Sequence, residues 1–387
     1  MLIIGTRRQI QKYREHPGMN QSTLKNVQYG LASFLKKQDE EGPIASFERG
    51  SAVDTILTGN EGDFKDLYYI SALEKKPSDK EMEIVELIFN KLSSVYEDSI
   101  TQFGLDSPMI KGTIQQSIEE IGWQPNWKIE TRIEKITGNP LCQEYFEDLK
   151  KSIGKTILSQ AQMEQINATV ESLRTNEYTK DFFDRKSIME NDRVIVLYQV
   201  PIYFSIDGIE CKALPDIATL FLNKVEIENE DGTKEVQTIL KGIQLIDLKT
   251  TSKDTLEFFD AVMSYRYEIQ AAWYIEAVQR VNEKFWNDLG LVLSKDTPTE
   301  ILPFAFIVES ITEPGKPLIY HMNESLIAQG KEGTQDIYYQ DRLVKKGKRG
   351  FLSLMAELKY YQDNEFTEDI ILQGKEGNLI LGINGIV

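Results

Sequence analysis

The feature of this sequence that most constrains its fold is a strand-forming stretch that begins near residue 192. Valine, isoleucine, leucine, tyrosine and phenylalanine dominate three successive segments there, and most of these residue types favour extended backbone. Asp207-Gly208 and Asp231-Gly232 separate the segments and are typical of tight turns between strands. We therefore predict an antiparallel meander of three strands, over 194–204, 208–222 and 238–249.

Helical patterns flank these predicted strands. Apolar residues recur at three- and four-residue spacing over 82–96 and 163–173, and a long helix is predicted over 265–281. Asn20 offers an N-cap to a helical segment near the start of the chain, and a further helix is predicted over 47–57. The other predicted elements are a hairpin over 114–136, strands over 303–310 and 318–322, and a basic helical region over 324–361.

Together these elements indicate an α/β fold, with a mixed central β-sheet flanked by helices and a helical insertion before the strands. At 387 residues the chain exceeds a typical domain of roughly 100 to 200 residues. We predict three parts: an N-terminal helical part of the core over 1–74, a mostly helical insertion over 75–190, and the β-sheet core with C-terminal helices over 191–387.

Composition narrows the class of protein. The net charge is -17, from 44 Lys+Arg against 61 Asp+Glu, which disfavours broad coating of a nucleic acid but allows a local basic rim around an acidic centre. Cys142 and Cys211 are too few for a disulfide framework or an iron–sulfur cluster, so we expect neither. The sequence has no membrane-length apolar run and no cleavable signal pattern, and we expect a cytoplasmic protein with no membrane partner.

The residues that carry chemistry lie at the ends of the predicted strands. Asp216 follows Leu214-Pro215, and the third strand ends with Asp247 and Lys249. Because side chains alternate along a strand, Asp247 and Lys249 share one face. Two neighbouring carboxylates form a hard oxygen cluster suited to Mg²⁺ or Mn²⁺, and an ammonium beside them can orient a nucleophile or stabilise developing charge on a phosphate. The alternative is that these residues have no catalytic role and form an ion pair at a solvated strand end, since Asp-x-Lys triplets are common.

The surrounding motifs resemble a known family. Leu214-Pro215-Asp216, the segment 246–251 and the segment 265–274 occur in the order and spacing of RecB-like nucleases of the PD-(D/E)XK superfamily. The likeness is closest to the RecE-type exonucleases (exodeoxyribonuclease VIII) of phages and prophages. It extends to the segments 16–25, 47–57 and 157–166 and is weak between about 75 and 150. The resemblance implies a restriction-endonuclease-like core.

The resemblance also implies roles for individual residues. Asp216 and Asp247 are expected to bind the metal ion, and Lys249 to position the nucleophile. Gln270 and Tyr274 lie one helical turn apart, so they share a helix face, and the resemblance assigns them to support of the active site and the DNA backbone.

Two residues depart from the family pattern. Asp54 stands where relatives usually place a metal-binding histidine, and we expect it to be a further ligand, because a carboxylate is a hard ligand that Mg²⁺ accepts. The alternative is that Asp54 points away and bonds to a backbone amide. Gln199 stands where a glutamate often precedes the first motif, and is expected to support the site together with Gly50, Ser51 and Thr250.

A basic run near the C-terminus is a second candidate for contact with DNA. The cluster is either a phosphate-contacting loop or a solvated turn. Tyr338 and Tyr339, just before it, offer rings for base stacking or for core packing. The basic residues expected to bind DNA are Lys345, Lys346, Lys348 and Arg349.

The function implied by the resemblance is Mg²⁺- or Mn²⁺-dependent hydrolysis of DNA, by 5′-to-3′ resection of duplex ends in phage recombination. It further implies a homo-oligomer that passes single strands to an annealing protein. Two alternatives stay open: an endonuclease or nickase on the same core, and a nuclease-derived DNA-binding or structural module without catalysis. Digestion of linear, circular and nicked DNA would separate the three.

Overall fold

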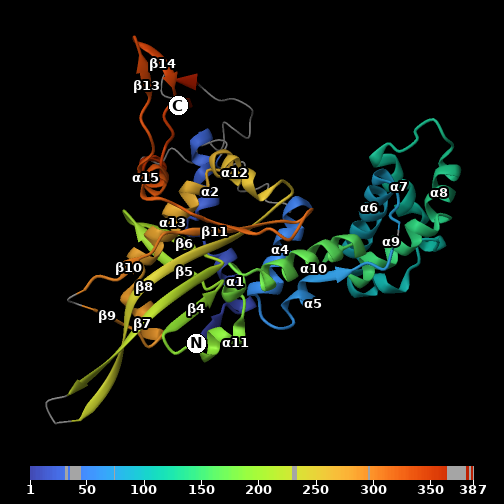
Figure 1. Cartoon of the computed structure of the whole chain (residues 1–387). Coiled ribbons are helices and arrows are strands. Elements are labelled where there is room, and N and C mark those ends of the chain that lie inside the picture. The colour runs from blue at the N-terminus through green and yellow to red at the C-terminus, as the bar shows by residue number, and fades with distance from the viewer. Residues whose placement is uncertain are drawn as a thin grey trace. The chain divides into compact units, whose positions relative to one another are not determined.

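The computed structural model describes residues 1–30, 34, 45–73, 75–228, 233–294, 297–363, 381–382 and 385–386 (Figure 1). Two compact units emerge from this part of the chain. Met1–Asn60 and Ala168–Val387 form the first, and Glu61–Asn167 forms the second. The second unit is helical and overlaps the insertion predicted over 75–190, while the domain boundaries proposed from the sequence stay predictions.

A mixed β-sheet is the centre of the first unit. Among the described residues it has eight strands, with β9 (Val292–Leu293) and β10 (Glu300–Ile301) pairing along β8. The β1–β4, β8–β9, β8–β10 and β8–β11 pairs are parallel, and the β4–β7, β7–β8 and β11–β12 pairs are antiparallel. The main order is β1 (Leu2–Ile4), β4 (Val194–Tyr198), β7 (Ile217–Glu228), β8 (Lys234–Thr251), β11 (Ala305–Ser310) and β12 (Leu318–His321).

The predicted meander is confirmed in its antiparallel pairing but not in its number of strands. Pro201 and Pro215 interrupt the first two predicted segments, because proline has no N–H to donate to a ladder. The pieces between them, β5 (Ile202–Ile206) and β6 (Ile209–Ala213), leave the central sheet and form their own hairpin. Positive φ angles of 50° at Asp207 and 84° at Gly208 form its two-residue turn.

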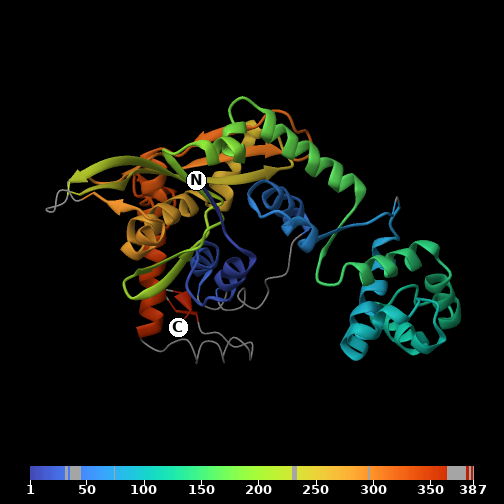
Figure 2. The ribbon, with the colours of Figure 1, turned by 90° about the horizontal axis from the view of Figure 1, so that it is seen from below.

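Helices cover the sheet, as Figure 2 shows for α13 (Tyr267–Arg280) and α16 (Phe351–Asp363) on one face. Trp273 of α13 and Phe351 of α16 are fully buried, with ring centroids 5.5 Å apart. At the other face the Tyr198 hydroxyl donates to the carbonyl of Phe182. The α/β class and the flanked mixed sheet predicted from the sequence are confirmed.

The remaining helices of the first unit are mostly short. Asn20 caps α2 as predicted, because its side chain accepts a hydrogen bond of 2.8 Å from the backbone N–H of Thr23. The predicted helix over 265–281 is α13, separated from α12 by Arg266 in a left-handed conformation. Their bounds are α1 (Arg7–Glu15), α2 (Gln21–Lys25), η1 (Asn26–Tyr29), α4 (Ala45–Thr58), η4 (Lys180–Phe182), α11 (Arg185–Glu190), η5 (Thr255–Glu257), α12 (Phe258–Tyr265) and α14 (Glu283–Asp288).

The helical region predicted over 324–361 is wrong in its middle. Gly333, with φ at 91°, ends α15 (Glu324–Glu332), and a β-hairpin follows before α16. The hairpin strands are β13 (Ile337–Tyr339) and β14 (Arg342–Lys345), which pair antiparallel. Their β-branched and aromatic residues outweigh the helical pattern. A second short hairpin, β15 (Leu381–Gly382) with β16 (Gly385–Ile386), lies near the end of the chain.

The second unit has its own hydrophobic core. The hairpin predicted over 114–136 is wrong: two helices occupy this range, and buried Ile114, Ile118, Ile133 and Ile136 recur at helical spacing. Its elements are α5 (Asp63–Leu67), β2 (Tyr68–Ile70), α6 (Asp79–Tyr96), η2 (Glu97–Gln102), η3 (Pro108–Ile110), α7 (Lys111–Ile121), α8 (Ile129–Thr137), α9 (Pro140–Lys151) and β3 (Thr156–Leu158), with α10 (Gln160–Thr175) continuing into the first unit.

Two further expectations concern the cysteines and membranes. Cys142 and Cys211 are both buried free thiols. None of the described helices combines the length and the apolar character that crossing a membrane requires.

Close contact between α15 and α13 gives a test of this packing. A Cβ placed on Gly330 would lie 1.9 Å from the carbonyl oxygen of Glu268, which is backbone and cannot rotate away. We expect Gly330→Ala to lower the free energy of unfolding by about 1 to 3 kcal/mol. The matched control is Gly112→Ala in α7, where nothing lies within 4 Å of the added carbon, so stability should be unchanged or rise. Chemical denaturation followed by circular dichroism measures both, and equal stability of the two variants would contradict the packing argument.

Candidate active site

Asp216 and Asp247 face each other across neighbouring strands. β7 and β8 pair antiparallel with Ile217 opposite Ile246. Asp216 directly precedes Ile217 and Asp247 directly follows Ile246, so the two residues occupy the next opposed positions. Asp216 also accepts a 2.8 Å hydrogen bond from the backbone N–H of Leu248, through its Oδ2. The two carboxylates predicted from the sequence are therefore brought together at the strand ends.

Asp247 is 2% exposed and its oxygens face two different partners. Oδ1 accepts a 2.7 Å hydrogen bond from Nε2 of Gln270, and Oδ2 forms an ion pair with the ammonium of Lys249. Beyond that ion pair, the described residues offer Oδ2 no regular hydrogen bond. Lys249 thus lies on the same strand face as Asp247, as the alternation of side chains predicted.

Gln270 and Tyr274 connect the two aspartates through α13. Nε2 of Gln270 lies 3.2 Å from the Tyr274 hydroxyl, which donates a 3.1 Å hydrogen bond to the carbonyl of Leu214. Leu214 belongs to the same short segment as Asp216, so one helix face fixes both the Asp247 carboxylate and the backbone that carries its partner. The grouping of these two side chains beside the carboxylates, expected from the resemblance, is present in the structure.

Helix α4 brings Asp54 to the same place. Gly50 packs on Thr250, since a Cβ on Gly50 would lie 2.7 Å from the Thr250 hydroxyl oxygen. Asp54 follows one helical turn later and is partly buried. The charges of Lys249 and Asp247 both act on the pKa of its carboxyl.

Gln199 and Ser51 lie at the margin of this arrangement. Gln199 has a left-handed φ of 47°, and its side-chain Nε2 donates a 3.0 Å hydrogen bond to the hydroxyl of Thr58 in α4. Its backbone N–H donates to the carbonyl of Asp216 at 3.0 Å. Gln199 therefore links α4 to the Asp216 segment. Ser51 is exposed, and its carbonyl accepts a hydrogen bond from Thr55 within α4.

The electrostatics are those of several carboxylates around one ammonium. Burial raises the pKa of Asp216 well above its usual range, and the charges of Asp247 and Asp54 raise it further. Burial also raises the pKa of Asp54 to about 7, with Lys249 opposing the shift and Asp247 adding to it. Burial would lower the pKa of Lys249, but the carboxylates of Asp247 and Asp216 outweigh it and hold that pKa above its ordinary value.

The donor set fits a hard divalent cation. Carboxylate oxygens dominate it, and Mg²⁺ in proteins takes one or two carboxylates and keeps several waters. In the described part of the chain, no three His, Cys, Asp or Glu side chains converge tightly enough to enclose an ion by themselves. A site built on Asp216 and Asp247, with Asp54 close by, matches the magnesium pattern better than the closed cage of a structural metal. Repulsion from Asp247 helps to raise the pKa values of Asp54 and Asp216, and a bound cation would relieve that repulsion.

Lys25, the last residue of α2, adds a second cation. Its Nζ lies 5.8 Å from the ring centroid of Tyr267, and Nζ of Lys249 lies 5.1 Å from the same centroid. Nζ of Lys25 also donates to the carbonyl of Tyr265 at 3.0 Å. Burial, followed by the like charge of Lys249, lowers the pKa of Lys25 to about 8. Nothing in the sequence marks Lys25 beyond its place at the end of the segment 16–25.

The basic run predicted to bind DNA divides into two kinds of residue. Arg349 forms an ion pair with Glu357 and donates to Ser353, and Nζ of Lys348 lies 3.3 Å from the carbonyl of Met263, so both are held against the protein. Lys345 and Lys346 lie exposed at the end of β14.

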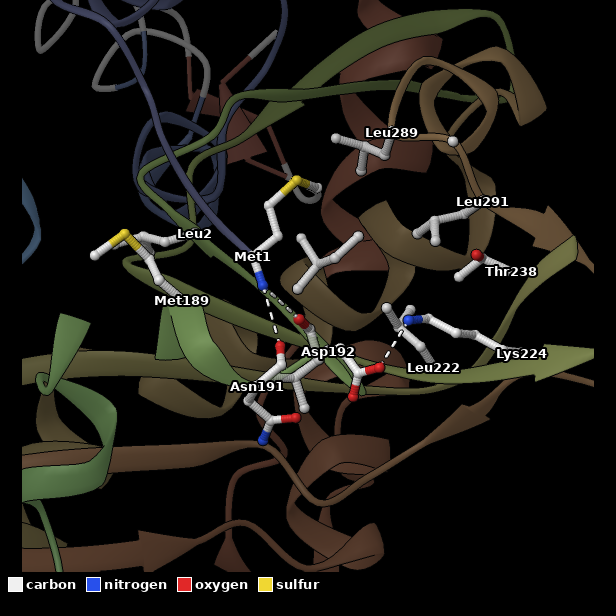
Figure 3. A pocket seen from close by; sticks show the side chains of 13 residues that line it. Met1, Leu2, Met189, Asn191, Asp192, Leu222, Lys224, Thr238, Leu289 and Leu291 are labelled. Carbon is white, nitrogen blue, oxygen red and sulfur yellow. Dashed lines mark hydrogen bonds and ion pairs between the residues drawn. The ribbon is translucent and has the colours of Figure 1, made fainter. Parts of the chain in front are cut away.

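A separate surface pocket of about 550 Å³ lies near the first residues of the chain (Figure 3). The N-terminal ammonium of Met1 donates to the carbonyls of Asn191 and Val194 there, at 3.3 and 2.9 Å. Lys224 and Asp192 form an ion pair of 2.8 Å at its wall. Asp54, Asp216 and Asp247 do not line this pocket, so we do not place the active site in it.

Comparison with known proteins adds little to this geometry. No family model matches the sequence, and no curated protein matches it. A crystal structure from Eubacterium rectale, of a protein described as a candidate exonuclease, is similar over 88% of each chain, with 12% sequence identity and a TM-score of 0.25. At that TM-score the likeness carries no functional assignment.

The raised pKa of Asp54 leads to a test of the charge cluster. A carboxyl with a higher pKa in the folded than in the unfolded state destabilises the fold once it is ionised. For Asp54 this destabilisation is absent below about pH 4 and complete above about pH 7. We expect Asp54→Asn, in EDTA, to raise the free energy of unfolding by about 1 to 2 kcal/mol at pH 8 and to change it little at pH 4. Urea titrations at both pH values measure this, and an equal effect at the two would place Asp54 outside the cluster.

Proposed function

We propose that this protein is a Mg²⁺- or Mn²⁺-dependent DNA nuclease with Asp216, Asp247 and Lys249 at its catalytic centre. We propose further that it resects duplex ends in the 5′-to-3′ direction, as an exonuclease of phage recombination. The observation that carries the proposal is the pair of aspartates facing each other across β7 and β8, with the Lys249 ammonium on Asp247. This combination of anionic oxygens and a positioned cation suits metal-assisted hydrolysis of a phosphodiester.

Each residue has a distinct part in this reaction. Asp216 and Asp247 would hold the ion, with Asp54 as a further ligand, and the ion when bound would supply Lewis acidity that polarises the phosphate. Gln270 holds Oδ1 of Asp247 in place, which leaves the orientation of that carboxylate fixed during turnover. Lys249 stays protonated across the physiological range because its pKa is raised, so it can donate to the nucleophile or to a phosphate oxygen.

The two ammonium groups beside Tyr267 support a phosphate as the substrate group. Lys25 and Lys249 both lie within 6 Å of that ring centroid, next to a centre that is otherwise anionic. A phosphodiester that enters there would meet both ammonium groups close to the carboxylates. Lys25 is the residue we assign to a non-bridging oxygen, because an ammonium binds phosphate as a point charge.

The biological setting of the proposal comes from the resemblance of the motifs. It includes DNA as the substrate, a homo-oligomeric assembly and a single-strand annealing protein as partner. Digestion of linear, circular and nicked DNA by the purified protein distinguishes an exonuclease, which needs ends, from an endonuclease or nickase.

Removal of any of the three central side chains tests the proposal. Asp216→Ala and Asp247→Ala should lower cleavage of linear duplex DNA by about 10³-fold or more, because each takes a carboxylate from the ion. Lys249→Ala should lower turnover by about 10²-fold and leave metal binding, measured by calorimetry, in place. Asp260→Ala, an exposed aspartate in α12, is the matched control and should cleave like the wild type. Wild-type rates in either central aspartate variant would exclude this site.

The identity of the residue at position 54 should set the preference for the metal. A carboxylate is harder than an imidazole and adds negative charge, so the native site should favour Mg²⁺. We expect Asp54→His to retain some cleavage and to shift the ratio of Mn²⁺- to Mg²⁺-supported activity toward Mn²⁺ several-fold. Metal titrations of the initial rate give the ratio, with Asp54→Asn as the control for loss of charge alone. An unchanged ratio in Asp54→His would remove residue 54 from the ligand set.

A further inference from the structure

The β13–β14 hairpin is a well-formed arm. Gln340 and Asp341 have φ angles of 48° and 61°, which form a two-residue turn that matches the twist of the strands. At its base, Asp336 accepts a 2.6 Å hydrogen bond from the backbone N–H of Gly347, and the backbone N–H of Thr334 donates one of 2.7 Å to the carbonyl of Lys348. In Figure 1 the hairpin extends away from the sheet beyond α15.

The arm exposes large apolar side chains. The residues of both its strands are exposed to solvent. A two-stranded hairpin alone is marginally stable in water. Exposed apolar groups gathered on one element mark a binding surface. The side chains that are more than half exposed are Ile337, Tyr338, Tyr339, Leu343 and Val344.

Cations stand opposite the apolar residues on one face of the arm. Tyr339 pairs with Arg342 and Ile337 with Lys345 across the two strands, and directly opposed residues share a face. The segment 333–350 has five basic and two acidic residues, a net charge of +3 in a chain of net charge -17. One of the two acidic residues, Asp336, is engaged in the hydrogen bonds at the base. The surface therefore favours a polyanion that also has flat apolar groups.

The base of the arm is joined to the candidate active site. The guanidinium of Arg266 donates a 2.7 Å hydrogen bond to the carbonyl of Arg349, and Nζ of Lys348 reaches the carbonyl of Met263 at 3.3 Å. The residue after Arg266 is Tyr267, whose ring contacts Lys249 and Lys25. The base of the arm is therefore held by the residue that directly precedes Tyr267 in the chain.

We propose that the β13–β14 arm binds single-stranded DNA at the active site, with Tyr339 stacking on a base and Arg342, Lys345 and Lys346 on phosphates. This inference rests on the proposed nuclease function. Aromatic stacking combined with backbone cations is how proteins hold single strands without sequence preference. In this proposal the basic residues that contact phosphates differ from those expected from the sequence. Arg342 is added to Lys345 and Lys346, whereas Lys348 and Arg349 hold the base of the arm.

Binding of a labelled oligothymidylate to the full-length protein in EDTA tests the inference without cleavage. We expect Tyr339→Ala to weaken the affinity roughly tenfold, because one base loses its stacking partner. Tyr339→Phe should bind like the wild type, since the ring is retained. The triple variant Arg342→Ala, Lys345→Ala, Lys346→Ala should reduce the slope of log affinity against log salt by about 2, at roughly 0.7 for each phosphate that the arm no longer neutralises. Tyr178→Ala, an exposed tyrosine outside the arm, is the matched control.

Two results would overturn the inference, and both can be told apart from failure of the nuclease proposal. Unchanged affinity and salt slope in the arm variants, in a protein that still cleaves DNA, would show that the arm does not bind the strand. A change in sedimentation mass of the arm variants, with unchanged oligonucleotide affinity, would make the arm a contact between protein copies. Failure of the nuclease proposal would appear as absence of cleavage by the wild type with Mg²⁺ and with Mn²⁺, whatever the arm variants do.

Discussion

The ion pair between Asp247 and Lys249 is the interaction on which the candidate site depends. The antiparallel pairing of β7 and β8 brings two carboxylates together, and α4 adds a third, so like charges accumulate in a partly buried place. The Lys249 ammonium compensates for part of that charge. Because the compensation is incomplete, the pKa values of Asp216 and Asp54 stay raised. Binding of the proposed metal ion would relieve this repulsion and so stabilise the folded state.

Local sequence rules were sufficient for the parts of the site that lie on one element. Alternation along a strand predicted that Asp247 and Lys249 share a face, and helical spacing predicted the same for Gln270 and Tyr274; both are present in the structure. The mixed sheet between helices also followed from hydrophobic pattern and turn residues. For the two residue pairs, the geometry within a single strand or helix determines the outcome, so distant residues do not alter it.

Features that depend on tertiary contacts were missed or wrong. Lys25 belongs to a short helix far from β8 in sequence, and only packing brings its ammonium to the ring of Tyr267. The charged residues over 333–350 fit a helical pattern, whereas the turn at Gln340 requires a positive φ that no propensity indicates. The strand breaks at Pro201 and Pro215 were predictable in principle, because proline interrupts a ladder.

The contact between Gly50 and Thr250 gives the site a mechanical limit. Thr250 is β-branched and lies in a strand, so its hydroxyl has little freedom to move aside. With no side chain on Gly50, α4 approaches the Thr250 side chain closely, and Asp54 lies one turn further along the same helix. Metal–ligand distances tolerate only about 0.2 Å of variation. In the proposed metal site, the position of Asp54 therefore depends on the absence of a side chain at Gly50, four residues earlier in the same helix.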